Sequence, residues 1–234
     1  MEHQYLKVEM HAHSNEDPED YKLPYSAKSL IDEAKKKGYD VLGLTLHNKV
    51  LEGKELASLK RYAASKGLFF FAGCEATIEG CHVIIHNITE AERSKIRSLD
   101  DLRKLKNRLQ KSGREILIIA AHPYYTLPFK RISLKDLLVK NIDIFDAIEH
   151  SSMYTYLINF NRKAIRMADK YHKPLLGLGD IHTLEQLGSN YTMVESEKSV
   201  NSIIRAIKKK HLKLVTKPLS IIKFFIISVK MLSL

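Results

Sequence analysis

The chain has 234 residues, which is enough for one large domain or two small ones with a buried core. Hydrophobic residues make up 44% and charged residues 28%, with 10 glycines and 6 prolines, and these values exclude a disordered tail, a collagen-like repeat and a low-complexity linker. The net charge of +11 suggests nucleic-acid binding, but +8 of it comes from nine Lys or Arg and one acidic residue between Glu197 and Leu234, so the rest of the chain lacks a basic binding face.

Short β-branched and aliphatic runs alternate with helical periodicity along the chain. Seven runs have the length of a buried strand, at residues 6–10, 40–46, 68–74, 81–86, 116–121, 143–148 and 174–179. Helical spacing lies between most of them, over residues 26–37, 52–66, 99–112 and 155–172. The alternation predicts a single-domain α/β fold with a parallel sheet. Only the pair 68–74 and 81–86 leaves no room for a connecting helix.

Polar residues at the ends of the predicted strands favour a closed barrel over an open doubly wound sheet. Histidine or acidic residues lie at or just after the carboxyl ends, namely His11, His13, His47, Glu75, His122, Asp180 and His182. Barrel enzymes collect their functional groups from several strands at that end, and no glycine-rich phosphate turn follows the first strand. We expect a distorted barrel of about seven strands over residues 1–217 and an amphipathic helix or tail over 218–234.

The eleven histidines of the chain point to metal binding. His11 and His13 are two residues apart, so on a strand their imidazoles face the same side, and Asp180 and His182 repeat this spacing. Glu75 ends an apolar run, where a carboxylate is costly unless it is paired or metal-bound. Each residue alone has a structural explanation, such as an ion pair or a core histidine. Chance is a poor explanation for six strands that carry such groups at the same end.

The motifs HAHS, TLHN, GCEATIEGCHVIIH, AAHP and GDIHTLEQLGS occur in this order. Together they resemble the polymerase and histidinol phosphatase (PHP) family of metal-dependent phosphoesterases, over about residues 6–216. The resemblance implies a distorted (β/α)7 TIM-like barrel with two or three divalent ions per chain. Zinc, manganese and iron all suit a ligand set rich in imidazoles with few carboxylates.

The resemblance also assigns ligands to residues of this chain. One ion would take His11, His13, Glu75 and Asp180. A second would share Glu75 and add His82 and His122. The third would take His47, His182 and one acidic residue of the loop, with Asp17 as our choice and Asp20 and Glu16 as alternatives. In catalysis we expect Glu75, Asp180 and His182 to take part.

The chain departs from the family pattern at Leu46, where the family commonly has an aspartate beside the ligand that matches His47. Such orienting partners are worth roughly 10–100-fold in metal affinity or activity. We therefore expect an aspartate at position 46 to raise the metal affinity or the rate. Gly179-Asp180-Ile181-His182 stands where the family has Ser-Asp-Ala-His, a change that keeps both ligands and alters mainly packing.

The implied activity is hydrolysis of a small phosphomonoester, or of a nucleotide or oligonucleotide phosphoester, by a hydroxide activated at two or three ions. Charge supports this substrate class, because three divalent ions with three carboxylates leave about +3, or about +2 after a bridging hydroxide, which a phosphate dianion balances. An amidohydrolase-type metal hydrolase and a non-catalytic RNA- or polymerase-binding barrel are the alternatives.

Several residues outside these motifs also carry expectations. Cys74 and Cys81 should be buried apolar residues, since two cysteines cannot staple a chain of this length. With no signal-peptide-like start, we expect a cytoplasmic protein. We place His86 in the core or beside the site, and His150 and the pair 161–162 either in a substrate pocket or on a helix surface.

The C-terminal segment after Pro218 is apolar but contains Lys223 and Lys230, which makes it a poor transmembrane span. It is expected to cover the end of the barrel. The alternative is weak contact with a membrane surface or a partner, where its basic residues favour anionic lipid.

Overall fold

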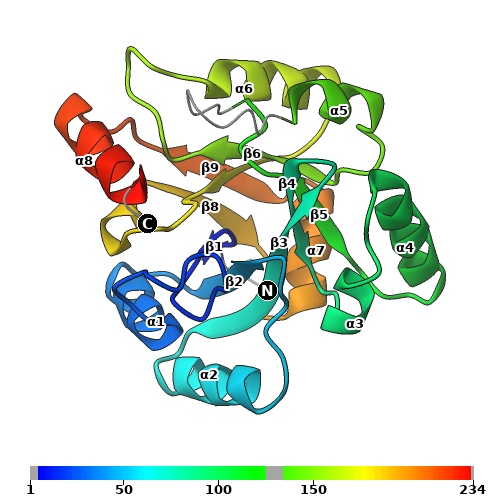
Figure 1. Cartoon of the computed structure of the whole chain (residues 1–234), viewed down its shortest axis with the longest axis horizontal. Helices are drawn as coiled ribbons and strands as arrows, with labels where there is room; N and C mark the ends of the chain where they lie inside the picture. The colour runs from blue at the N-terminus through cyan, green and yellow to red at the C-terminus, as the bar shows by residue number, and fades with distance from the viewer. Residues whose placement is uncertain (1–4, 125–133, 233–234) are drawn as a thin grey trace.

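The computed structural model describes residues 5–124 and 134–232. Its strands form one sheet in the order β7-β6-β5-β4-β3-β2-β1-β8-β9, surrounded by helices (Figure 1). The strands are β1 (Tyr5–Glu9), β2 (Val41–His47), β3 (Phe69–Ile78), β4 (Cys81–His86), β5 (Leu117–Ala120), β6 (Ala147–Ser151), β7 (Leu175–Leu178), β8 (Asn190–Glu195) and β9 (Leu212–Thr216).

The single-domain α/β prediction is confirmed, but the sheet is more irregular than a (β/α)7 barrel. Within the described residues it has nine strands; β4 runs antiparallel to β3 and β5, β8 runs antiparallel to β1, and β9 runs antiparallel to β8. β3 and β4 form a hairpin because Glu79 and Gly80 both adopt positive φ, 50° and 74°, as a tight two-residue turn requires.

The strands β8 and β9 are absent from our sequence prediction. The burial of β8 alternates strictly between buried and half-buried residues, so it lacks the continuous apolar run that marks a central strand. The predicted strand 143–148 is also displaced, since β6 covers Ala147–Ser151. This displacement places Glu149 and His150 inside a strand.

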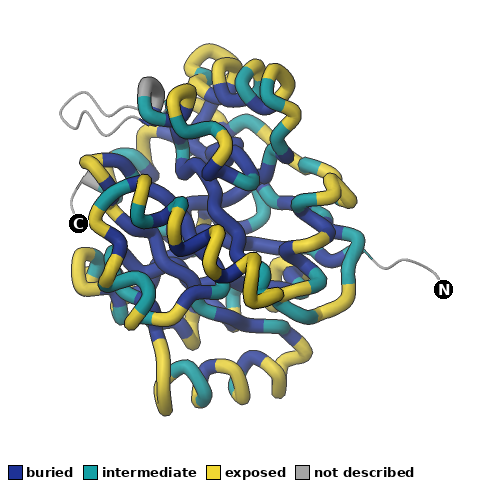
Figure 2. Tube along the Cα trace, turned by 90° about the vertical axis from the view of Figure 1, so that its right-hand side faces the viewer, coloured by how far each residue is buried: buried dark blue, intermediate teal, exposed yellow. Residues whose placement is uncertain are grey.

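The helices are α1 (Ala27–Lys36), α2 (Gly53–Ser65), α3 (Glu90–Arg93), α4 (Leu99–Lys111), α5 (Lys135–Lys140), α6 (Asn161–Lys170), α7 (Val200–Lys208) and α8 (Ile221–Leu232), with a short 3-10 helix at Leu184–Gln186. Buried segments lie at the centre of the molecule and exposed residues on the outer helix faces (Figure 2). This pattern follows from amphipathic helices; in α1, for example, Leu30, Ile31 and Ala34 are buried on one face. The helix α6 starts later than predicted, at Asn161.

The sheet is nearly closed into a barrel at its carboxyl end. Ala12, just after β1, forms a parallel bridge with Ile181, just after β7. Two hydrogen bonds of 3.1 Å make this bridge, from His13 N–H to the carbonyl of Ile181 and from Ile181 N–H to the carbonyl of His11. The closure therefore joins the two segments that carry the HAH and DIH motifs. The helix α7 packs Ile203, Ile204 and Ile207 against the inward-facing residues of the strands.

The chain after β9 forms the helix α8, which packs Phe224 and Ile227 against Met153 and Leu219. This agrees with a final helix that covers part of the barrel. Across the described residues, no helix combines the length and apolar character needed to span a membrane.

Candidate metal centre

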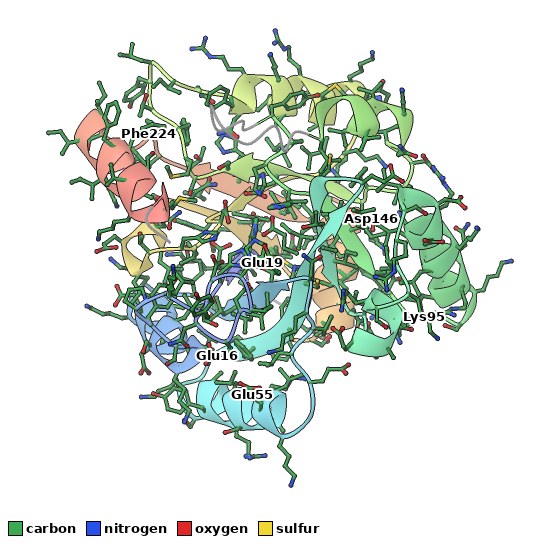
Figure 3. The ribbon with its side chains drawn as sticks, viewed as in Figure 1. Glu16, Glu19, Glu55, Lys95, Asp146 and Phe224 are labelled. Atoms are coloured by element: carbon green, nitrogen blue, oxygen red, sulfur yellow. The ribbon has the colours of Figure 1, made fainter. Side chains whose placement is uncertain are left out.

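The residues predicted as ligands gather at the carboxyl end of the barrel. His11 and His13 follow β1, His47 ends β2, Glu75 and His82 lie within β3 and β4, His122 follows β5, and Asp180 and His182 follow β7. The loop before α1 adds Asp17 and Asp20. Figure 3 labels two other residues of this loop, Glu19 near the centre of the view and Glu16 closer to α1 and α2. Six of these side chains are buried: His11, His13, Asp17, His47, Glu75 and Asp180.

Glu75 lies at the centre of the cluster and its two carboxylate oxygens face different histidines. Oε1 is 2.9 Å from His82 Nδ1 and 3.1 Å from His122 Nε2. Oε2 is 3.3 Å from Nε2 of both His11 and His13, and 3.1 Å from Nε2 of His47. One buried carboxylate is thus shared between two groups of imidazoles, which is the arrangement of a bridging ligand.

Asp180 completes the first group. Its Oδ1 is 3.4 Å from His11 Nε2 and 3.6 Å from His13 Nε2, and His11, His13, Glu75 and Asp180 all offer ligand atoms within 4.8 Å of one another. Ligand atoms that share one ion at about 2.0–2.2 Å lie about 3.0–3.5 Å apart. The spacing in this group therefore suits a single ion.

A second group contains Asp20. Its Oδ2 is 3.1 Å from His182 Nε2, 3.3 Å from His47 Nδ1 and 3.5 Å from His13 Nδ1. The ligand atoms of these four residues also lie within 4.8 Å of one another. The ligand atoms of His47, Glu75 and His82 form another such group. It contains His47, whereas the resemblance paired Glu75 and His82 with His122. His122 still approaches Glu75 on the Oε1 side.

Asp17 and Glu16 have other partners in the loop. Asp17 Oδ2 is 3.1 Å from Nδ1 of both His13 and His47 and accepts the His47 N–H at 2.7 Å. Glu16 accepts the N–H of Ala27 with both oxygens, at 3.1 and 3.0 Å, and so caps α1. Of the three acidic residues left open by the sequence, Asp20 is the one grouped with His47 and His182.

The donor atoms of the cluster fit a cation. Four buried atoms, His11 Nε2, His13 Nε2, Asp20 Oδ2 and Asp180 Oδ1, have no hydrogen-bond partner among the described residues, and all four face the cluster. No Lys or Arg nitrogen in residues 5–124 and 134–232 forms an ion pair with these carboxylates, whose charged contacts are histidines. Buried unpaired polar atoms are costly, and a divalent ion would satisfy them.

The pKa values in the cluster reflect both burial and the opposite charges of carboxylates and imidazoles. Burial raises the pKa of Glu75, but His11 and His82 hold it well below its usual range. Burial lowers the pKa of His182, while Asp180 and Asp20 raise it to about 10. Without metal, protons on the histidines would compensate the carboxylates, and bound cations would replace those protons.

Two buried carboxylates that the sequence analysis missed support the cluster from behind. Glu149 Oε2 lies 3.1 Å from His11 Nδ1 and accepts the His122 N–H at 2.9 Å. Glu9 accepts the His11 N–H at 2.9 Å and the Gly179 N–H at 3.0 Å, and burial raises its pKa to about 8. The available signal was a glutamate within an otherwise apolar strand, in LKVEM and in DAIEH.

Gln186 holds the loop that carries Asp180 and His182, and it was also missed. Its side chain accepts the N–H groups of His182 and Thr183 at 2.8 and 2.7 Å. It donates to the carbonyls of Asp180 and Gly179 at 2.9 and 3.3 Å. Asp180 has a positive φ of 48°, a strained conformation for a non-glycine residue that surrounding contacts must maintain.

Two residues explain the departures from the family pattern. Leu46 is fully buried in the apolar layer beneath α1 and α2, so it faces away from the cluster and the expected benefit of an aspartate there loses its basis. A Cβ on Gly179 would lie 2.1 Å from Ile181 Cδ1 and 2.9 Å from Glu9 Oε2. The larger Ile181 thus fills the space of a side chain at 179, as the packing interpretation requires.

The charge argument for a phosphate dianion also needs correction. The sequence analysis counted three carboxylates, but Asp17 and Glu149 contact ligand candidates in addition to Glu75, Asp180 and Asp20. Five carboxylates would nearly offset three divalent ions. Charge alone therefore does not select a dianionic substrate.

Other expected residues lie outside the cluster. Cys74 and Cys81 are buried in the apolar core, as predicted. His86 is buried and lies 3.0 Å from the Met10 carbonyl through Nε2, which agrees with a core role. His150 is buried in β6 with its ring 5.1 Å from that of Tyr154.

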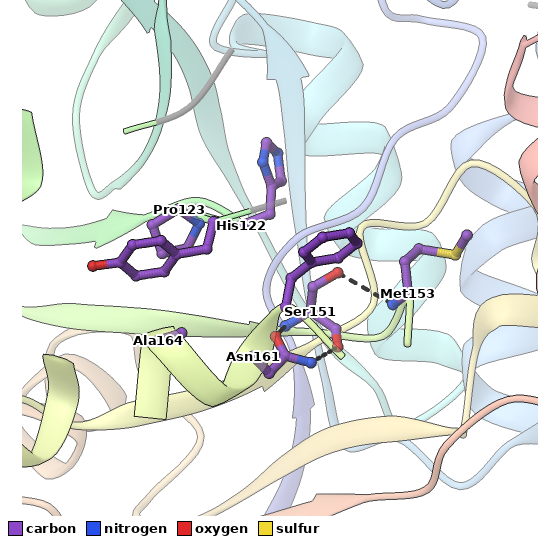
Figure 4. Close-up of a pocket in the computed structure, with 8 residues that line it drawn as sticks. His122, Pro123, Ser151, Met153, Asn161 and Ala164 are labelled. Atoms are coloured by element: carbon purple, nitrogen blue, oxygen red, sulfur yellow. Dashed lines mark hydrogen bonds between the residues drawn. The ribbon is translucent and has the colours of Figure 1, made fainter. Parts of the chain in front are cut away.

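A small hollow, partly open to solvent, is lined by His122, Ser151, Met153, Phe160 and Asn161, among others (Figure 4). Asn161 lines this hollow. Its amide accepts from the N–H and donates to the carbonyl of Ser151, each at 2.9 Å. It therefore anchors the end of β6, while Arg162 is exposed on α6.

Comparisons with known proteins agree with this geometry. The family model described as PHP-associated matches residues 159–212, and no curated protein matches the sequence. The crystal structure of PsfC from Pseudomonas syringae has a TM-score of 0.61 at 18% identity and covers 98% of each chain.

Two further structures share the fold. A protein of Bifidobacterium adolescentis described as a proposed metal-dependent phosphoesterase has a TM-score of 0.53 at 13% identity, covering 92% of this chain and 98% of its own. An amidohydrolase of Chromobacterium violaceum with bound sulfate and no metal has a TM-score of 0.52 at 15% identity, covering 75% and 87%. The family model matches one segment of the chain, and these structures share its fold.

Proposed function

We propose that this protein is a metal-dependent hydrolase of phosphoric esters. The observation that carries the proposal is the division of the Glu75 oxygens between two groups of imidazoles, next to buried donor atoms without partners. Such a centre suits hydrolysis, because divalent ions, when bound, lower the pKa of water and offset charge on phosphoryl oxygens. The description of the Bifidobacterium neighbour as a metal-dependent phosphoesterase supports the same reaction class.

The proposed ligand sets combine the groups in the structure with the contact between His122 and Glu75. The first ion would be held by His11, His13, Glu75 and Asp180, and the second by Glu75 with His82 and His122. The third would be held by His47, His182 and Asp20, in preference to Asp17 because Asp20 Oδ2 is the oxygen grouped with both histidines. Zinc, manganese and iron all suit these nitrogen and oxygen donors.

The remaining polar residues would orient these ligands. Glu149 contacts His11 Nδ1, which fixes the ring so that Nε2 faces the cluster. Asp17 contacts Nδ1 of His13 at 3.1 Å and restricts that ring in the same way, with His13 Nε2 facing Glu75 and Asp180. Carboxylate partners of this kind set the tautomer and basicity of a ligating histidine.

We propose that Glu75, Asp180 and His182 act directly in catalysis, Glu75 by sharing its two oxygens between ions. The side chain of His182 is 11% exposed and so partly accessible to solvent. Small phosphomonoesters and nucleotide or oligonucleotide phosphoesters both remain within this substrate class. The sulfate bound by the Chromobacterium neighbour is a tetrahedral dianion like phosphate.

A second candidate is an amidohydrolase-type metal hydrolase. The observation in its favour is the set of five carboxylates in contact with ligand candidates. With little net positive charge left, the centre is compatible with a neutral substrate as well as an anionic one.

The deciding experiment combines elemental analysis of the purified protein with a hydrolysis screen. The screen would contain nucleotides, sugar phosphates, an aryl phosphodiester and a set of cyclic amides, with Mn²⁺ or Zn²⁺ added. We expect two or three bound ions and release of phosphate or of the aryl alcohol. Bound metal with turnover of amides alone would establish the second candidate, and absence of both metal and turnover would favour a binding protein.

Glu75→Gln tests the bridge itself. It should remove bound metal and abolish turnover with little loss of fold, because a neutral amide cannot serve two cations equally. Glu55→Gln, an exposed change on α2 (labelled in Figure 3), is the matched control and should behave as wild type. Retained turnover in Glu75→Gln would refute the assignment of a shared ligand.

A further inference from the structure

The helix α8 has an apolar face on the outside of the protein as well as one against the barrel. Phe224 and Ile227 are buried against Met153 and Leu219. On the outer side Ile222 is 74% exposed, Phe225 57% and Val229 64%. At 100° per residue the exposed apolar residues of α8 span an arc of about 140°, so the exposed face is as apolar as the buried one.

A second element presents large apolar side chains beside α8. The loop between β6 and α6 turns at Thr155, whose N–H donates to the Ile158 carbonyl at 2.8 Å and whose hydroxyl accepts the N–H groups of Leu157 and Ile158 at 3.2 and 2.9 Å. This turn holds Tyr156 and Leu157 outward, 83% and 80% exposed. The exposure therefore comes from a hydrogen-bonded turn.

The two elements are fixed to each other. Leu219 N–H donates to the Tyr154 carbonyl at 2.9 Å, the hydroxyl of Tyr154 is 2.6 Å from Thr216 Oγ1, and Met153 packs in the same cluster as Phe224 and Ile227. The loop lies beside α8 in Figure 1. We define the α8 patch as the exposed apolar side chains of both elements: Tyr156, Leu157, Ile158, Ile221, Ile222, Phe225, Ile226 and Val229.

The segments that build the α8 patch contain no acidic residue. Residues 150–168 have three Arg or Lys and no Asp or Glu, and residues 198–234 have nine Arg or Lys and no Asp or Glu. Arg162, Lys163 and Lys217 are exposed next to the patch in sequence. Lys223 donates to the Glu185 carbonyl at 3.0 Å and Lys230 pairs with the Glu185 carboxylate at 3.1 Å, which holds α8 in place.

We propose that the α8 patch docks on the surface of an anionic lipid membrane. Exposed Ile, Phe, Tyr and Val side chains would enter the headgroup boundary, and the exposed cations that neighbour them in sequence would face acidic headgroups, the combination that drives interfacial binding. The binding is peripheral, because α8 has 12 residues and a spanning helix needs about 20. A second copy of the chain is a poorer occupant, since a symmetric contact would bring two acid-free basic segments together.

Vesicle co-sedimentation of the full chain tests the proposal. We expect binding to phosphatidylcholine vesicles that contain about one third phosphatidylglycerol, and at least about tenfold weaker binding to phosphatidylcholine alone or at high salt. Phe225→Ser with Ile222→Ser should weaken binding at least about tenfold, and Leu157→Ser should weaken it on the second element. Val139→Ser, a matched change of an exposed residue on α5, should leave it unchanged.

Two results would overturn the proposal. One is the absence of binding to acidic vesicles by the wild-type chain, or equal binding by Phe225→Ser with Ile222→Ser. The other is a wild-type dimer in light scattering that these substitutions convert to a monomer without any vesicle binding, which would assign the patch to a second copy. Circular dichroism of each variant confirms that the fold is retained, and the readout does not depend on catalytic activity.

Discussion

Gln186→Leu should weaken the metal centre without changing any proposed ligand. The glutamine side chain is 1% exposed and makes four hydrogen bonds to the backbone of residues 179–183. Leucine has a similar volume but no polar atom, so two N–H groups and two carbonyls lose their hydrogen bonds to this side chain, although the Gly179 carbonyl keeps the one from Ser152. At about 1 kcal/mol for each of the three shorter bonds, we expect a loss of about 3 kcal/mol in the free energy of unfolding.

The effect on metal should be larger than this loss of stability suggests. Asp180 and His182 depend on Gln186 for the conformation of their loop, and orienting partners of ligands are worth roughly 10–100-fold in metal affinity. Urea unfolding gives the stability change, and competition with a chromophoric chelator gives the affinity. Gln110→Leu, an exposed change on α4, is the control. A metal affinity within about twofold of wild type would refute the positioning role.

Three further predictions concern single side chains. Asp20→Asn should remove about one ion per chain in elemental analysis, because Asp20 is grouped with His47 and His182. Asp17→Asn should mainly lower the metal affinity, because Asp17 contacts ring nitrogens and a backbone N–H. The opposite order would restore Asp17 as the ligand. Leu46→Asp should lower the free energy of unfolding in urea by about 3 kcal/mol or more, since it buries a carboxylate in an apolar layer. A rise in metal affinity without this loss of stability would contradict the packing argument. Burial lowers the pKa of His86 from 6.5 to about 3, so below pH 6.5 the unfolded chain binds a proton that the folded chain does not. His86→Gln, which can still donate to the Met10 carbonyl, should remove about 2 kcal/mol of the stability lost by the chelator-treated protein between pH 7 and 5; an unchanged pH dependence would contradict a buried neutral His86.

Local patterns in the sequence were sufficient to locate the central strands and the residue types that gather in the candidate site. Buried strands are continuous apolar runs, so β2, β4 and β7 were located within about a residue of their observed bounds. His11 and His13 were assigned to one cavity because side chains two residues apart share a side of a strand. The same reasoning placed Cys74 and Cys81 in the core.

The tertiary structure decided which groups lie together across long stretches of chain. Glu9 reaches Gly179 and Glu149 reaches His11, and no local spacing reports contacts between residues more than a hundred positions apart. Asp20 and Asp17 are equivalent in the sequence of a polar loop, and only the path of that loop separates a carboxylate near His182 from one bound to a backbone N–H. Leu46 likewise showed its orientation only once β2 was packed beneath α1 and α2.

The C-terminal helix shows the same division. Its apolar composition and basic flanks are properties of the sequence, but periodicity alone left open whether the apolar residues cover the barrel or face outward. Packing against Met153 and Leu219 uses one side of α8 and leaves the other exposed. Residue type determines what a side chain can do, whereas burial and partners depend on contacts between distant segments, which form only when the whole barrel closes.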